Sequence, residues 1–153
     1  MTKPTYLVDI QWEGCNCLGE QLEKILELIE LYPSTKNAVW YASDVDSSPI
    51  PDCIRNFADF IPKKIGDTSN LILICKNVDQ FLSGVFFAFS KDIGDQLNKG
   101  FETEDTSFRD IGDAILEIRA FDTTFFEIYT SDYELARKIS ERFHCEISTE
   151  ELL

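Results

Sequence analysis

A β-hairpin pattern in the C-terminal third of the chain restricts the possible folds more than any other feature. Apolar and polar side chains alternate over Ala114–Phe121 and over Thr124–Thr130, and the turn residues Asp122 and Thr123 separate the two stretches. Strands joined by so short a turn must pair antiparallel. We therefore expect an antiparallel hairpin within a sheet. The side chains expected to face the core are Leu116, Ile118, Ala120, Phe126 and Ile128.

Helical and strand patterns occupy much of the remaining chain. An amphipathic helix is predicted over Leu18–Leu31, a short helix over Cys53–Ile61, and a last helix that opens with the capping-box sequence Ser131–Glu134. Alternating or continuous apolar residues predict further strands. These strands are Tyr6–Trp12, Asn37–Ser43, Leu71–Cys75, Ser83–Ser90 and Cys145–Ser148.

Together these elements predict an α+β fold. We expect a mixed, mainly antiparallel sheet with two or three helices packed mostly on one face. Short turns require antiparallel neighbours, whereas the crossovers through the early helices permit a parallel pair. The sequence contains no internal repeat and no obvious linker, so we expect residues 1–153 to form a single globular domain.

The chain is strongly acidic. It has 28 Asp and Glu residues against 14 Lys and Arg, which gives a formal net charge of −14. A domain with this charge repels nucleic acid and anionic membranes and attracts basic surfaces. Hydrophobic residues still make up 44% of the chain, too many for a disordered protein. We therefore expect a folded protein whose partner is a basic protein, with no direct contact to nucleic acid or membrane.

The N-terminus and the cysteines favour a cytoplasmic protein. Met1–Tyr6 lacks the apolar stretch of a signal peptide, and no apolar run reaches the roughly 18 residues of a membrane helix. The five cysteines are scattered and odd in number, so we expect them to be reduced. Cys15 and Cys17 lie too close together for the usual zinc spacing, and a metal or redox role for them is left as an alternative.

The sequence shows no diagnostic catalytic or cofactor motif. It has no phosphate-binding glycine loop and no Gly-x-Ser-x-Gly elbow, and its single histidine, His144, directly follows the last predicted helix. Asp44–Ser48 begins like a calcium loop, but Pro49 stands where an EF-hand needs glycine. Glu117–Arg119 is only faintly similar to a metal-dependent nuclease, because the usual lysine is missing. We expect no catalytic residue, no cofactor and no metal.

The carboxylates gather in particular stretches. From Asp92 to Glu117, eight carboxylates against two cations (Lys99 and Arg109) give a local charge of −6. Acidic loops can serve solubility alone. The alternative is a negative surface that docks a basic protein around an aromatic anchor. The residues predicted to bind this partner are Glu102, Glu104, Asp105, Asp110, Asp113, Asp44, Asp46 and Phe101, with Tyr41 and Phe108 as further candidate anchors.

Three segments resemble bacterial immunity proteins of polymorphic toxin and contact-dependent growth inhibition systems: Trp40–Asp46, Gln80–Phe86 and Arg119–Glu127. The similarity in size, acidity and α+β pattern extends over most of the chain, and no catalytic motif contributes to it. The resemblance implies a cytosolic protein that binds and neutralises a cognate toxin domain, often a nuclease. It does not supply individual interface residues.

The favoured hypothesis is therefore an immunity protein that neutralises a basic, nuclease-type toxin domain through an acidic surface. Two alternatives stay open. One is an acidic regulator or DNA mimic that sequesters a DNA-binding protein, and the other is a small enzyme whose acidic or metal site has not been located.

Overall fold

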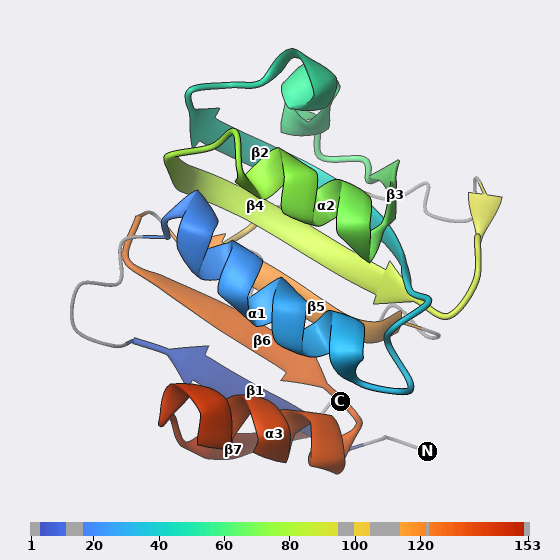
Figure 1. Ribbon diagram of the computed structural model, residues 1–153, viewed down its shortest axis with the longest axis vertical. Coiled ribbons are helices and arrows are strands. Elements are labelled where there is room, and N and C mark those ends of the chain that lie inside the picture. The colour runs from blue at the N-terminus through green and yellow to red at the C-terminus, as the bar shows by residue number, and fades with distance from the viewer. Residues whose placement is uncertain (1–3, 12–16, 95–99, 105–113, 122, 152–153) are drawn as a thin grey trace.

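The computed structural model describes residues 4–11, 17–94, 100–104, 114–121 and 123–151 (Figure 1). Within these ranges, strands and helices alternate along the chain before the hairpin predicted from the sequence. In chain order the elements are β1 (Pro4–Ile10), α1 (Gly19–Leu31), β2 (Val39–Ser48), the 3-10 helix η1 (Asp52–Ala58), β3 (Lys63–Asp67), α2 (Thr68–Cys75), β4 (Gln80–Phe89), β5 (Ala114–Phe121), β6 (Phe125–Thr130), α3 (Tyr133–Phe143) and β7 (Ile147–Glu151).

The seven strands form one sheet in the order β3-β2-β4-β5-β6-β1-β7. Every neighbouring pair of these strands is antiparallel, so the parallel pair that the sequence permitted does not occur among them. The helices α1, α2 and α3 lie over the same face of the sheet (Figure 1). The α+β class and the placement of the helices on one face therefore agree with the sequence prediction.

The hairpin prediction is confirmed: β5 has the predicted bounds, and β6 begins at Phe125, one residue later than predicted. β5 and β6 pair with Ile118 opposite Ile128 and Ala120 opposite Phe126. These four side chains are fully buried, as is Leu116 to within 1%. The amide of Thr124 donates to the carbonyl oxygen of Phe121 at 2.7 Å and closes the turn.

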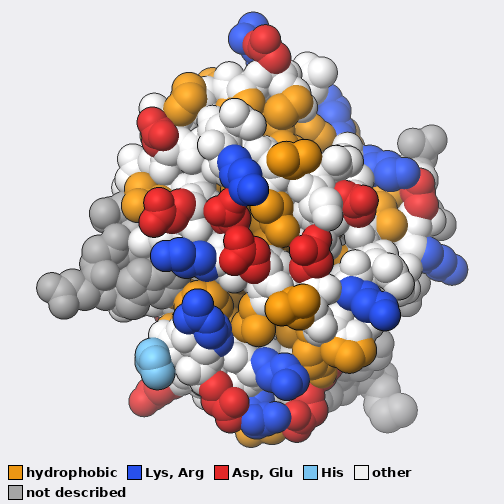
Figure 2. Space-filling model, in the orientation of Figure 1, with side chains coloured by type: hydrophobic (Ala, Val, Ile, Leu, Met, Phe, Trp, Pro, Cys, Tyr) orange, Lys and Arg blue, Asp and Glu red, His pale blue; other side chains and the backbone are white. Residues whose placement is uncertain are grey.

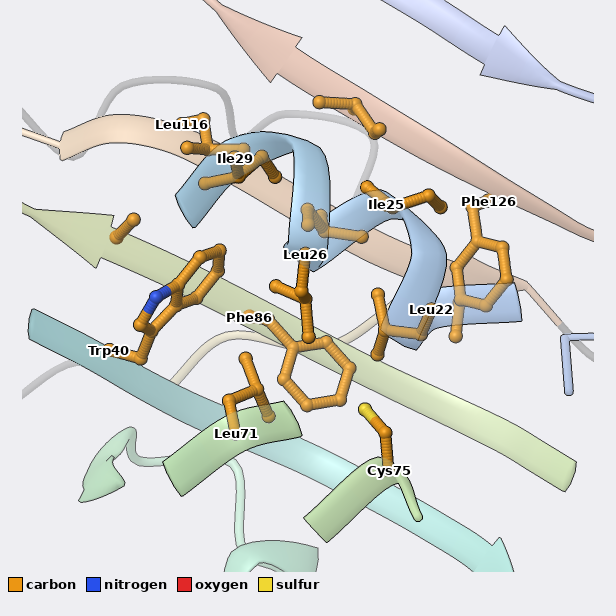
Figure 3. Close-up of a cluster of buried hydrophobic side chains, with 14 of the residues drawn as sticks. Leu22, Ile25, Leu26, Ile29, Trp40, Leu71, Cys75, Phe86, Leu116 and Phe126 are labelled. Atoms are coloured by element: carbon orange, nitrogen blue, oxygen red, sulfur yellow. The ribbon is translucent and has the colours of Figure 1, made fainter. Parts of the chain in front are cut away.

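The main core lies between the helices and the face of the sheet that they cover (Figure 3). All apolar side chains on one face of α1 pack into this core, because residues at i, i+3, i+4 and i+7 share one face of a helix. Trp40 lies in the same core, and its indole nitrogen donates to Thr68 Oγ1 at 2.9 Å. The α1 residues with no exposed surface are Leu22, Ile25, Leu26 and Ile29.

The strand predicted over Leu71–Cys75 is wrong, because this segment is the C-terminal part of α2. Asp67 begins the helix by accepting the amide of Asn70 on Oδ1 at 2.9 Å. Leu71 and Cys75 face the core, whereas Leu73 is 57% exposed. A short, continuous apolar run has no periodicity that distinguishes a buried strand from a buried helix. Cys75 is 1% exposed and lies in the main core as a small apolar residue.

Several boundaries also differ from the sequence prediction. The helix expected over Cys53–Ile61 is the shorter η1; it buries Ile54 and Phe57 but leaves Ile61 51% exposed. β2 extends to Ser48, beyond the predicted end of this strand at Ser43, and β3 was not predicted. The last helix is capped by Asp132 Oδ1, which accepts the amide of Leu135, and not by the predicted Ser131.

Gly19, the first residue of α1, lies against the turn that follows α2. A Cβ atom at this position would lie 2.1 Å from the carbonyl oxygen of Val78 and 2.4 Å from that of Cys75. Both are backbone atoms, so a side chain on Gly19 would have to move α1 away from α2. The lack of a side chain at this position therefore permits the close packing of the two helices.

We expect Gly19→Ala to lower the free energy of unfolding by about 1–3 kcal/mol, as overpacking of a tight contact does. Urea denaturation measures this change. The matched control is Glu20→Ala on the exposed side of the same helix, which should alter the free energy by less than about 0.5 kcal/mol. If the two variants unfold at the same urea concentration, α1 and α2 are not in this close contact.

Candidate partner-binding site

The face of the sheet opposite the helices carries a second apolar cluster. Side chains of a strand alternate between the two faces, so Tyr41 and Phe87 point away from the core that holds their neighbours Trp40 and Phe86. Phe101 packs onto this cluster with its ring 5.2 Å from that of Phe87. The members of the cluster are Tyr41, Val85, Phe87, Phe89, Ile93 and Phe101.

Phe101 and Tyr41 are therefore not exposed aromatic anchors. Phe101 is 4% exposed and Tyr41 2%, so neither ring can be inserted into a partner. The prediction of Phe101 as a contact residue is wrong for this physical reason: the second apolar cluster already buries its ring. Phe108, the other aromatic candidate, lies outside the described residues.

The segment 101–104 alternates between buried and exposed residues. Phe101 and Thr103 are buried, whereas Glu102 and Glu104 are exposed. Three hydrogen bonds hold the buried positions on the sheet: the hydroxyl of Ser43 donates to the Phe101 carbonyl at 2.8 Å, the Gly84 amide donates to Thr103 Oγ1 at 2.9 Å, and the Thr103 amide donates to Asp44 Oδ2 at 2.8 Å. This attachment directs both glutamates to the solvent.

Arg119 supports this segment from beneath. It is 1% exposed, its Nη1 donates to the carbonyl oxygen of Thr103 at 3.1 Å, and its Nε donates to Glu117 Oε2 at 2.7 Å. Its guanidinium carbon also lies 5.7 Å from the centre of the Tyr129 ring. The Glu117–Arg119 pair, faintly nuclease-like in sequence, is thus a buried ion pair that anchors segment 101–104.

Asp44 links three parts of the chain at a bulge in β2. Its backbone has a φ of 52°, its amide donates to the carbonyl oxygen of Asp59 at 2.8 Å, and its own carbonyl accepts the hydroxyl of Ser83 at 2.6 Å. Since Asp44 Oδ2 also accepts the Thr103 amide, residues 59 apart in sequence meet here. Asp46 follows on β2 with an exposed side chain.

The fold therefore brings together half of the predicted contact residues. We call Asp44, Asp46, Glu102 and Glu104 the acidic surface. Its members come from β2 and from the segment that the hydrogen bonds of Asp44 and Thr103 fasten beside it. The other predicted carboxylates, Asp105, Asp110 and Asp113, lie outside the described residues.

Some carboxylates of the described chain form an ion pair with a cation and others do not. Several carboxylates have a partner within 4 Å: Asp59 pairs with Lys63 at 2.9 Å and Arg137 binds two glutamates of α3. No described Lys or Arg forms such a pair with Asp44, Asp46 or Glu104. The helix-bearing face instead shows acidic and basic side chains interspersed (Figure 2).

Asp92, although part of the acidic stretch in sequence, has a structural role. Lys64 Nζ, the Tyr41 hydroxyl and the Gly94 amide all donate to its carboxylate, at 2.5, 2.6 and 2.8 Å. The hydrogen bond from Lys64, followed by that from Tyr41, holds the pKa of Asp92 well below its usual range. Burial, and then the hydrogen bond to Asp92, raises the pKa of Tyr41. Asp92 is thus ionised and its charge is matched by Lys64.

Metal and disulfide chemistry find no support in the described part of the chain. Cys17, Cys53, Cys75 and Cys145 are free, and Cys15 lies outside the described residues, as does Trp12 of the first predicted strand. The described residues contain no group of three or more His, Cys, Asp and Glu side chains placed to hold a metal ion. His144 is the C-cap residue that directly follows α3, as the sequence predicts, and it is exposed.

Comparison with known proteins gives no family to which the chain can be assigned. Neither a protein-family model, nor a curated protein sequence, nor a solved structure matches it. Among the helices that the structure describes, none combines the length and the apolar character needed to cross a bilayer.

Proposed function

We propose that this chain is a cytoplasmic immunity protein that binds a basic, nuclease-like toxin domain and neutralises it. The observation that carries the proposal is the fixed, exposed position of Glu102 and Glu104 beside Asp44 and Asp46. These side chains come from separate parts of the chain, and a buried arginine and a set of hydrogen bonds hold them together. Such pre-organisation supports a binding role, because little freedom is lost when a partner binds.

The expected partner carries Lys and Arg side chains that normally contact phosphates. Carboxylates can occupy the same cationic groove and exclude the nucleic acid. Asp46 and Glu104 have no cation of the described chain to satisfy them, which leaves their charges available to such a groove. Asp105, Asp110 and Asp113 follow segment 101–104 in sequence and are proposed as further contacts.

The proposal predicts that the gene immediately upstream encodes a protein with a toxic C-terminal domain, and the direct test uses that domain. We expect an equimolar amount of the purified chain to form a stable complex with that domain and to abolish its cleavage of nucleic acid. The same chain mixed with a basic DNA-binding regulator should leave DNA binding unchanged, whereas a DNA mimic would displace the DNA. Undiminished cleavage in the presence of excess chain would contradict the proposed function.

A further inference from the structure

An exposed aromatic side chain lies directly beside the acidic surface. Among the phenylalanines that the structure describes, only Phe60 is exposed, with 49% of its surface accessible, and its neighbour Ile61 is 51% exposed. Most of the others are deeply buried in the two apolar clusters. An exposed aromatic and aliphatic pair is typical of the apolar centre of an interface.

The backbone fixes Phe60 next to the segment that carries the glutamates. The amide of Phe101 donates to the carbonyl oxygen of Phe60 at 2.7 Å. A Cβ atom on Gly100 would lie 3.4 Å from Cβ of Phe60, so the Phe60 side chain leaves the backbone directly above Gly100. Gly100, Glu102 and Glu104 are all exposed, whereas Phe101 and Thr103 between them are buried. The exposed Phe60 side chain therefore lies against the start of the segment that carries the two exposed glutamates.

Asp44 completes this arrangement from the sheet. Its amide holds the Asp59 carbonyl and its carboxylate holds the Thr103 amide, so the Phe60 segment and the glutamate segment are both tied to one residue. Asp59 itself is matched by Lys63. An apolar pair is thus bordered by the carboxylates of the acidic surface.

We propose that Phe60 and Ile61 form the apolar centre of the partner interface and that the partner places an arginine side chain there. This inference rests on the proposed function and adds the chemistry of the contact. A guanidinium group is planar and weakly hydrated, so it can stack on the Phe60 ring while its N–H groups bind a carboxylate of the acidic surface. A lysine ammonium is a compact, strongly hydrated charge and cannot make both contacts with one planar group. The negative charge of the acidic surface thus favours a basic protein as the partner, and the Phe60 ring favours arginine over lysine.

The test compares two peptides of equal charge, acetyl-Arg-Gly-Arg-amide and acetyl-Lys-Gly-Lys-amide, titrated into the isotope-labelled full chain. We expect the arginine peptide to shift the amide resonances of Phe60, Ile61 and Glu102 and to bind roughly two- to fivefold more tightly, the ratio that an exposed cation–π contact supplies. Phe60→Ala should remove this preference. Leu73→Ala, which truncates an exposed leucine on α2, is the matched control and should retain it.

The outcomes separate this inference from the proposed function. Equal binding of the two peptides to the parent, or an unchanged arginine preference in Phe60→Ala, would overturn the arginine contact and leave toxin neutralisation intact. A chain that shows the arginine preference but fails to inhibit the toxin domain would instead contradict the proposed function. Phe60→Ala should also melt close to the parent, since half of this side chain is already exposed.

Discussion

Replacing Arg119 by Met is expected to lower the free energy of unfolding by about 3–5 kcal/mol. The guanidinium is buried and binds both Glu117 and the carbonyl oxygen of Thr103. Its removal leaves the carboxylate of Glu117, which is 4% exposed, without the counter-charge at 2.7 Å. A buried charge without a counter-charge is strongly destabilising. The single substitution should therefore lower the free energy of unfolding by much more than the small change in side-chain volume would. Chemical denaturation measures the effect.

A second variant identifies the cause of this loss. Arg119→Met combined with Glu117→Leu replaces the ion pair by apolar side chains and should recover most of the stability, as such replacements often do. The matched control is Arg137→Met, which breaks ion pairs on the exposed side of α3 and should cost about 1 kcal/mol or less. If the double variant is as unstable as Arg119→Met, the unpaired carboxylate of Glu117 does not cause the loss of stability.

The same variants should also affect segment 101–104. Without Arg119, the carbonyl of Thr103 loses the hydrogen bond that holds it to β5. We therefore expect faster hydrogen exchange at the Thr103 amide in the double variant, even where its overall stability returns. This separates the anchoring of the segment from the stability of the sheet.

Phe126→Ala is expected to cost about 3–5 kcal/mol, the range for truncation of a large aromatic in a core. Phe126 has no exposed surface and belongs to the cluster that contains Leu22 and Ile25 of α1 (Figure 3). For a chain of this length each kcal/mol corresponds to roughly 2–4 °C in melting temperature. A thermal melt should therefore show a melting temperature lower by roughly 6–20 °C.

Its neighbour in sequence supplies the control. Phe125 points to the other face of β6, is partly exposed, and stacks on Phe121 with ring centres 5.0 Å apart. Phe125→Ala should cost clearly less than Phe126→Ala, because less apolar surface returns to water. Equal losses in the two variants would contradict the register in which Phe126 faces α1.

The parts of the fold that the sequence predicts well are those with a strong local period. α1 and the β5–β6 hairpin repeat apolar residues at 3.6 and 2.0 residues over many positions, so a single face is defined without reference to the rest of the chain. Leu71–Cys75 lacks such a period, and its helix is set by the cap on Asp67 and by packing against α1. The short apolar run alone therefore could not indicate whether this segment forms a helix or a strand.

The candidate site was predictable in charge but not in arrangement. The acidity of Asp44, Asp46, Glu102 and Glu104 is visible in the sequence, whereas their proximity depends on a bulge in β2 and on hydrogen bonds between distant residues. Whether Phe101 or Phe60 is exposed depends on the second apolar cluster. The role of Arg119 depends on its contact with Thr103, 16 residues away, which no local pattern encodes.

The central claim is that the acidic surface attracts a basic toxin domain. The most direct measurement compares association rates of the toxin domain with the parent chain, with Asp46→Lys/Glu104→Lys and with the control Glu27→Lys/Glu146→Lys, whose exposed residues lie on α1 and before β7. All three proteins are measured at about 0.1 M and about 1 M salt, where exposed charges are screened over about 10 Å and about 3 Å.

Both double variants change the net charge equally, so only position distinguishes them. We predict that Asp46→Lys/Glu104→Lys associates roughly tenfold or more slowly than the parent at low salt and that high salt narrows this difference. The association rate of the control Glu27→Lys/Glu146→Lys at low salt should be much closer to that of the parent. Equal rates for the two double variants, or rates of the parent that do not depend on salt, would contradict a binding role for this surface.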